Sequence, residues 1–192
     1  MTYTIDNKWI SLDEVDAILR EHKTLELGDS ARSAIASCRN YLDEKIKRHD
    51  KLIYGINTGF GSLCNTAIEE DDLEQLQRNL VLSHACGAGE EVPQELVKRM
   101  LLLKVLGLAH GHSGVQVATV ERLIYFFNHS ILPVVYQQGS LGASGDLAPL
   151  AHLSLPLIGE GEVYFQGKKH QAAEVLKALH LEPIVLRSKE GL

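Results

Sequence analysis

The chain has 192 residues, of which 45% are apolar and 23% are charged, and its net charge is −6. This composition is ordinary for a soluble globular protein and argues against a nucleic-acid-binding surface. The richest apolar stretch is interrupted by Lys104, so it cannot span a membrane, and residues 1–9 lack the apolar core of a secretory signal. The three cysteines are odd in number and widely separated, which suits reduced thiols in a cytoplasmic protein better than a disulfide framework.

The first part of the chain is predicted to be helical. Residues 4–10 are short and mixed, as in a small strand, and Ser11 forms a capping-box pattern with Glu14. This pattern predicts a helix over 12–22. Apolar residues at helical spacing predict a second helix over 31–49.

A distinctive run, LIYGINTGFG, occupies residues 52–61. Leu52–Tyr54 is compatible with a short strand, and the three glycines that follow predict a loop. Taken alone, this run is typical of a surface turn with a packed tyrosine. Thr66 and Glu69 form a second capping-box pattern, which predicts a helix that continues through His84.

The middle of the chain carries the most apolar predicted helix. Pro93 fits its first turn, and the segment 96–109 is apolar on almost every face, so we expect it to be buried. His110 and His112 interrupt it, but no third ligand has a suitable spacing, so we predict no metal site. Residues 115–128 return to helical spacing and predict the next helix.

Three further elements are predicted towards the C-terminus. They are a helix over 147–157, a small hairpin that turns at Gln166-Gly167 and a short helix over 172–180. The sequence shows no internal repeat and no low-complexity linker. Together, these elements predict a single domain that is mainly α with minor β-structure.

The stretch GSLGASGD at 139–146 has three glycines and leads directly into a predicted helix. One interpretation is a helix start capped by Ser144 or Asp146, and another is an anion cradle, although the Gly-Lys-Ser/Thr ending of a nucleotide loop is missing. A third interpretation uses the order Ala143-Ser144-Gly145. The unhindered Gly145 nitrogen can attack the Ala143 carbonyl carbon, and loss of two waters, one from the Ser144 hydroxyl, leaves an electrophilic ring with an exocyclic methylene.

Residues 142–150, GASGDLAPL, closely resemble the signature of the aromatic amino acid ammonia-lyases, and 52–61 resembles their tyrosine loop. The segment LSHA at 82–85 is similar to the selectivity segment of the histidine ammonia-lyases in particular. The resemblance implies the N-terminal part of a helical, fumarase/aspartase-like fold. It also implies that Ala143-Ser144-Gly145 cyclises to 4-methylidene-imidazol-5-one, the cofactor of an elimination reaction.

By this resemblance, the cofactor captures the amine of the substrate so that ammonia leaves more easily. Tyr54 is implied to be the general base that removes a proton from the β-carbon. An unperturbed phenol has a pKa of about 10, so a tyrosine base needs positive helix ends directed at it, and the helix after Gly145 offers one. Asp146 and Gly61 are implied supporting residues, and Asp146 is expected to assist cyclisation.

The resemblance places His84 against the substrate ring, with Ser83 as the residue that orients it. An imidazole at this position can hydrogen-bond the polar ring edge of histidine or tyrosine, whereas phenylalanine offers no partner. We therefore expect L-histidine, converted to urocanate, to be preferred over tyrosine and then phenylalanine. A tyrosine or phenylalanine ammonia-lyase, and an aminomutase on the same scaffold, remain alternatives.

Members of this family are much longer than 192 residues, and Lys189-Glu190-Gly191-Leu192 leads in them into a motif with a catalytic asparagine. We therefore expect residues 1–192 to form a single N-terminal segment of the catalytic domain, with the C-terminal helical half absent. The family implies a cytoplasmic homotetramer that binds a small amino acid and neither nucleic acid nor membrane. A further alternative is that this chain alone is a folded but non-catalytic fragment.

Overall fold

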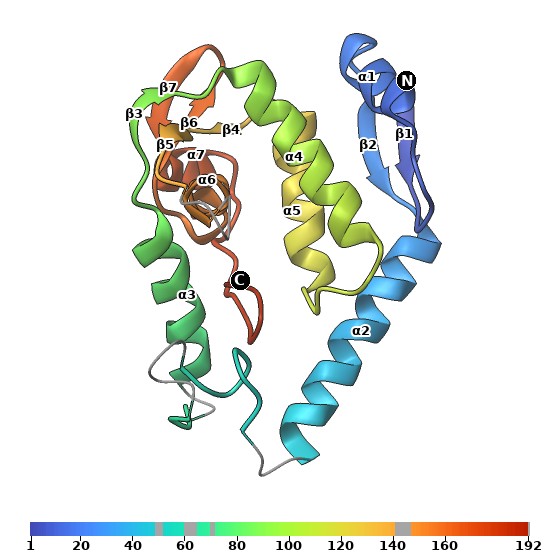
Figure 1. The fold of residues 1–192 in the computed structure, drawn as a ribbon. Helices are drawn as coiled ribbons and strands as arrows, with labels where there is room; N and C mark the ends of the chain where they lie inside the picture. The colour runs from blue at the N-terminus through green and yellow to red at the C-terminus, as the bar shows by residue number, and fades with distance from the viewer. Residues whose placement is uncertain (49–51, 60–64, 70–71, 141–146, 192) are drawn as a thin grey trace.

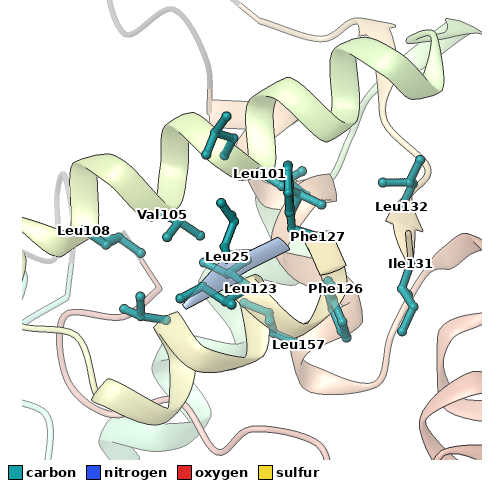
Figure 2. Packing of buried hydrophobic residues seen from close by; sticks show 14 of the residues in the cluster. Leu25, Leu101, Val105, Leu108, Leu123, Phe126, Phe127, Ile131, Leu132 and Leu157 are labelled. Atoms are coloured by element: carbon teal, nitrogen blue, oxygen red, sulfur yellow. The ribbon is translucent and has the colours of Figure 1, made fainter. Parts of the chain in front are cut away.

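Two helices form the centre of the fold in the computed structural model, which describes residues 1–48, 52–59, 65–69, 72–140 and 147–191. These helices, α4 (Gln94–Ala109) and α5 (Val117–Asn128), pack against each other (Figure 1). Figure 2 shows Leu101 of α4 in one buried cluster with Phe127 of α5 and with Leu25 from an N-terminal strand. The buried faces of the two helices therefore share one core, and both elements are helices, as the sequence predicts.

The N-terminal part of the chain is a β-α-β unit. β1 (Thr2–Ile5) and β2 (Thr24–Leu27) pair in parallel, and α1 (Leu12–Arg20) lies between them in sequence. The capping box predicted at the start of α1 is confirmed, because the Ser11 hydroxyl accepts the Glu14 N–H at 3.2 Å and the Glu14 carboxylate accepts the Ser11 N–H at 2.9 Å.

Two further helices flank the centre on different sides (Figure 1). α2 (Asp29–Arg48) contacts both α4 and α5 and confirms the predicted helix over 31–48, while residue 49 lies outside the described residues. α3 (Leu73–His84) packs against α6 (Leu147–Ser154), which a short 3-10 helix at Leu155–Ile158 continues. Together, α6 and this 3-10 helix cover the helix that the sequence predicts over 147–157.

Short strands lie beside α6 (Figure 1). β3 (Ala88–Glu91) pairs antiparallel with β5 (Tyr136–Gln138). A second sheet contains β4 (Leu132–Pro133), β6 (Glu162–Phe165) and β7 (Lys168–Gln171), and α7 (Ala172–Ala178) follows it. The predicted hairpin is confirmed as β6 and β7. It turns at Gln166 and Gly167, which both have positive φ, as a tight two-residue turn requires.

The strand predicted at Leu52–Tyr54 and the helix start predicted at Thr66 are both wrong. In each segment, hydrogen bonds to residues of the tyrosine loop replace the predicted pattern. Leu52–Tyr54 forms no strand, since a turn takes up its backbone groups. Thr66 and Glu69 open no helix, since the Thr66 carbonyl accepts the Gly59 N–H at 3.3 Å. α3 therefore begins only at Leu73.

The fold class is mainly α with minor β-structure, as predicted. Leu96 and Leu103 of α4 are exposed, so this helix is buried on one side rather than all round. Within the part of the chain that the structure describes, no helix has both the length and the apolarity needed to cross a membrane.

Candidate active site

Tyr54 lies in a loop whose backbone is held by the loop's own side chains. Asn57 Oδ1 accepts the Ile53 N–H at 2.6 Å, and the buried Thr58 hydroxyl accepts the Gly55 N–H at 3.2 Å. Gly55 has a φ of 69°, a left-handed conformation that favours glycine directly after the tyrosine. The Tyr54 side chain is 62% exposed, so the loop presents the phenol on the surface of the chain.

Ser188, in the C-terminal segment, hydrogen-bonds both the tyrosine loop and α2. Ser188 Oγ donates to the Ile56 carbonyl at 3.1 Å, and the Ser188 carbonyl accepts from Arg39 of α2 at 2.8 Å. The same guanidinium donates to the Gly114 carbonyl at 2.7 Å and to the Asp43 carboxylate at 2.6 Å. A buried guanidinium needs several acceptors to offset its lost hydration. The tyrosine loop is therefore fixed, through Ser188, to a buried charge on α2.

Glu190 acts as a capping carboxylate at the N-terminus of α5. It accepts the Gln116 N–H at 2.8 Å, the Gln116 side-chain amide at 2.6 Å and the Thr119 hydroxyl at 2.7 Å. The Arg187 N–H donates to the same carboxylate at 2.8 Å, which folds the C-terminal segment around it. A carboxylate is favoured here because the first N–H groups of a helix lack partners within the helix and carry partial positive charge.

Gly191 packs directly against α3. Its N–H donates to the side-chain carbonyl of Gln77 at 2.8 Å, and Gln77 is completely buried. A Cβ at Gly191 would lie 2.7 Å from the Gln77 backbone oxygen, which leaves no room for a side chain. The C-terminal segment therefore runs between α3 and α5, where Figure 1 shows its red trace.

His84 is the last residue of α3, and its ring is oriented by its own helix. Nδ1 lies 2.7 Å from the Leu80 carbonyl oxygen. The Ser83 hydroxyl lies 3.1 Å from the same oxygen and 3.2 Å from Nδ1. Because a carbonyl oxygen only accepts, Nδ1 carries the proton in this arrangement. In the neutral ring, Nε2 is then the nitrogen that can accept a hydrogen bond from a ligand.

A cavity of about 360 Å³ lies beside His84, between α3, α4, α5 and α6. Its wall is mostly aliphatic, and His84, Lys104 and Glu190 are among its polar residues. Such a wall suits a small, largely apolar ligand that has a few polar groups. Tyr54 does not line this cavity, so the described residues do not bring Tyr54 and His84 into one space.

The predicted residues of the tripeptide loop, and one of the tyrosine loop, lie outside the described residues. They are Gly61, Ala143, Ser144, Gly145 and Asp146. The described structure resumes with α6, which begins at Leu147, where the sequence predicts the helix. The flanks of the tripeptide loop are therefore known, and the roles of its residues stay predictions.

His152, on α6, is a buried polar residue that the sequence patterns did not reveal. Its Nε2 accepts the Gly87 N–H at 2.9 Å, and its ring packs edge-on against Tyr136 with 5.1 Å between the ring centroids. Burial lowers the pKa of His152 below its ordinary value, which favours the neutral ring that this hydrogen bond needs. The available signal was a lone histidine in the apolar run LAPLAHLS, since a polar ring there needs a partner.

Comparison with known proteins identifies the class of this fold. The family model described as aromatic amino acid lyase matches residues 10–192. A histidine ammonia-lyase of Deinococcus radiodurans is 49% identical over 183 residues, which cover 95% of this chain and 35% of that protein. The crystal structure of histidine ammonia-lyase from Trypanosoma cruzi has a TM-score of 0.88 and 37% identity, and the match covers 100% of this chain and 37% of that one. The tyrosine aminomutase of Streptomyces globisporus has a TM-score of 0.89 and 31% identity, with 100% and 36% covered.

These matches show that the helices and short sheets described above form part of the fold shared by the aromatic ammonia-lyases and aminomutases. The chain belongs to the aromatic amino acid lyase family, which confirms the resemblance found in its sequence. It spans about a third of the length of the curated relatives it matches.

Replacing Glu190 by glutamine should destabilise the 192-residue chain. Gln116, Thr119 and Arg187 all donate to the two carboxylate oxygens of Glu190. Glutamine replaces one of these oxygens by an NH₂ group, which cannot accept, so at least one hydrogen bond is lost. We expect the free energy of unfolding, measured by urea denaturation, to fall by about 1–3 kcal/mol. Glu174→Gln, at an exposed position of α7, is the matched control and should change it by less than about 0.5 kcal/mol. Equal effects would contradict the capping role of Glu190.

Proposed function

We propose that this chain is the N-terminal catalytic segment of an ammonia-lyase that eliminates ammonia from L-histidine to give urocanate. The observation that carries the proposal is the orientation of His84, whose Nδ1 is bonded to its own helix, so that Nε2 is the acceptor left for a ligand. Family membership supports the reaction class, and 49% identity to a histidine ammonia-lyase supports the substrate. We propose that the full-length enzyme is a cytoplasmic homotetramer in which further segments complete the site.

The preference for histidine rests on complementary hydrogen bonding. An accepting Nε2 on His84 complements a donor on the ligand, which is the imidazole N–H of histidine or the phenol O–H of tyrosine. Phenylalanine offers neither, and its binding would leave Nε2 without a partner beside an aliphatic wall. This ranks histidine and tyrosine above phenylalanine, and the curated relatives support histidine first.

We propose that Ala143-Ser144-Gly145 forms 4-methylidene-imidazol-5-one, with Asp146 as a supporting residue. The described residues around this tripeptide fit the group. A Cβ at Gly139 would lie 3.0 Å from the Cβ of Ala148. The residues on the two sides of the tripeptide are therefore close together, as cyclisation in a compressed loop requires. The first N–H groups of α6, which begins at Leu147, have no acceptor within the helix and can favour negative charge near its N-terminus. When present, the ring supplies an electrophile that makes the substrate amine a better leaving group.

We propose that Tyr54 is the general base, whose phenolate oxygen takes the proton from the β-carbon of the substrate. The hydrogen bonds of Asn57 and Thr58 hold the backbone around Tyr54, while its side chain is exposed towards the outside of this chain. Another subunit of the proposed homotetramer would meet the phenol there. Gly61 and Ser83 are proposed as supporting residues that shape the tyrosine loop and orient His84.

A lyase or aminomutase specific for tyrosine is the second candidate. The observation that favours it is the likeness to tyrosine aminomutase over the whole of this chain. A phenol O–H would also complement the accepting Nε2 of His84. The products separate the candidates, because histidine gives urocanate, whereas tyrosine gives coumarate with a lyase and a β-amino acid with an aminomutase.

In the full-length enzyme, Tyr54→Phe should lower kcat for histidine by about 10²–10⁴-fold, because it removes the proton acceptor. Urocanate formation, followed by its ultraviolet absorbance, measures the rate. Tyr41→Phe is the matched control, since Tyr41 is an equally exposed tyrosine on α2, and it should keep the wild-type rate. Turnover of the Tyr54→Phe enzyme near the wild-type rate would remove Tyr54 from this role.

In the same enzyme, His84→Leu should weaken the preference for histidine. The substitution removes the acceptor for the imidazole N–H, so kcat/KM for histidine should fall by about 10–100-fold. The value for phenylalanine should not fall, because phenylalanine loses no hydrogen bond. The measured quantity is the ratio of kcat/KM for the two substrates, and an unchanged ratio would show that His84 does not face the substrate ring.

The 192-residue chain alone should release little or no urocanate, because its relatives are far longer and the proposed site needs further segments and subunits. Its intact mass tests the cofactor separately, since ring formation would lower the mass by that of two water molecules. Ser144→Ala is the control, because alanine has no hydroxyl to lose. Steady urocanate formation by the purified chain would refute the need for other segments.

A further inference from the structure

A hydrogen bond between His152 and Gly87 joins α6 to the segment that follows α3. His152 is 8% exposed, and its Nε2 accepts the Gly87 N–H at 2.9 Å. Gly87 lies three residues after His84 in the sequence. The bond therefore connects α6 with the end of the helix that carries the proposed substrate-binding histidine.

Gly87 is also the point where both flanks of residues 141–146 meet. A Cβ at Gly139 would lie 3.0 Å from Gly87 Cα and 3.0 Å from Ala148 Cβ. A Cβ at Gly87 itself would lie 2.9 Å from His152 Nε2. Gly87, Gly139, Ala148 and His152 are therefore closely packed, and a Cβ at Gly87 or Gly139 would force a neighbour to shift. We name these four residues the loop base.

We propose that His152 is a positioning residue that holds the loop base together and so keeps the cofactor-forming tripeptide in register with His84. The proposal rests on the proposed function, because it assigns His152 to the same site. His152 acts through the N–H of Gly87, and it does not line the cavity beside His84. The neutral imidazole suits this task, because its Nε2 accepts a hydrogen bond.

A hydrogen bond at this position restrains two elements at once. Gly87 has no side chain and comes shortly after a helix end, so its backbone has wide conformational freedom unless its N–H is held. Without the acceptor, this partly buried N–H would lose its partner, and the chain after His84 would move relative to α6. Cyclisation and substrate orientation both depend on accurate placement, so both would suffer.

The decisive comparison is between His152→Gln and His152→Leu in the full-length enzyme. The side-chain oxygen of glutamine is as many bonds from Cα as His152 Nε2, so it can accept the Gly87 N–H, whereas leucine cannot. His152→Asn keeps an amide but is one bond shorter, and it decides the question if the leucine variant does not fold. His129→Leu, at an exposed position after α5, is the matched control.

Two measurements, made at a temperature at which the variants are folded, separate positioning from stability. Intact mass gives the fraction of chains that have lost two waters, and the ratio of kcat/KM for histidine to phenylalanine reports on His84. We expect His152→Leu and His152→Asn to lower the cyclised fraction and the ratio by about tenfold or more. His152→Gln and His129→Leu should stay within about twofold of the wild type in both measurements.

Equal cyclised fractions and equal ratios in the glutamine variant and in the leucine or asparagine variant would overturn the positioning role of His152. A purely structural role would lower the melting temperature of the variants and leave both measurements unchanged at the lower temperature. If the wild-type enzyme itself neither cyclises nor forms urocanate, the proposed function fails, and the positioning role fails with it. The wild-type sample therefore distinguishes the two failures.

Discussion

The carboxylate of Glu190 is the interaction on which the arrangement of the candidate site most depends. It gathers donors from the N-terminus of α5 and from its own segment, and it fixes that segment between α3 and α5. The neighbouring residues then reach α2 and the tyrosine loop through Ser188, and α3 through Gly191. Hydrogen bonds to an ionised acceptor are stronger than neutral ones, so one acidic side chain can organise elements that are far apart in sequence.

Close approach of the backbone complements these polar contacts. At Gly191 the chain approaches the backbone of Gln77 too closely for a Cβ, and at Gly139 it lies so close to Gly87 that a Cβ would force a neighbour to shift. Both contacts lie beside α3, the helix that ends at His84. The proposed substrate-binding histidine thus ends a helix that has one close backbone contact within it, at Gln77, and one just after it, at Gly87, which gives a ligand-binding side chain a rigid support.

Local sequence patterns predicted local structure correctly in several places, but they did not predict contacts between residues that are distant in the sequence. The Ser11 capping box and the hairpin turn at Gln166 depend only on neighbouring residues, and both are confirmed. The capping pattern at Thr66 opened no helix because pairing with the tyrosine loop overrides local propensity. The sequence analysis also missed the short strands β2, β3, β4 and β5, because their partner strands are distant in the sequence. The site divides in the same way. Continuous motifs revealed the family, whereas His152 bonds a residue 65 positions away, which no local pattern encodes.

The partners of Arg39 bear on how this segment acquires its structure during synthesis. Its nearly buried guanidinium donates to the carbonyls of Gly114 and Ser188, which come 75 and 149 residues later. While the ribosome is still adding those residues, two of the three acceptors of this charge do not yet exist, so α2 cannot settle in its final place. All three acceptors are present only after residue 188 has been added, so we expect α2 and the segment around Ser188 to complete their packing together once that residue has left the ribosome.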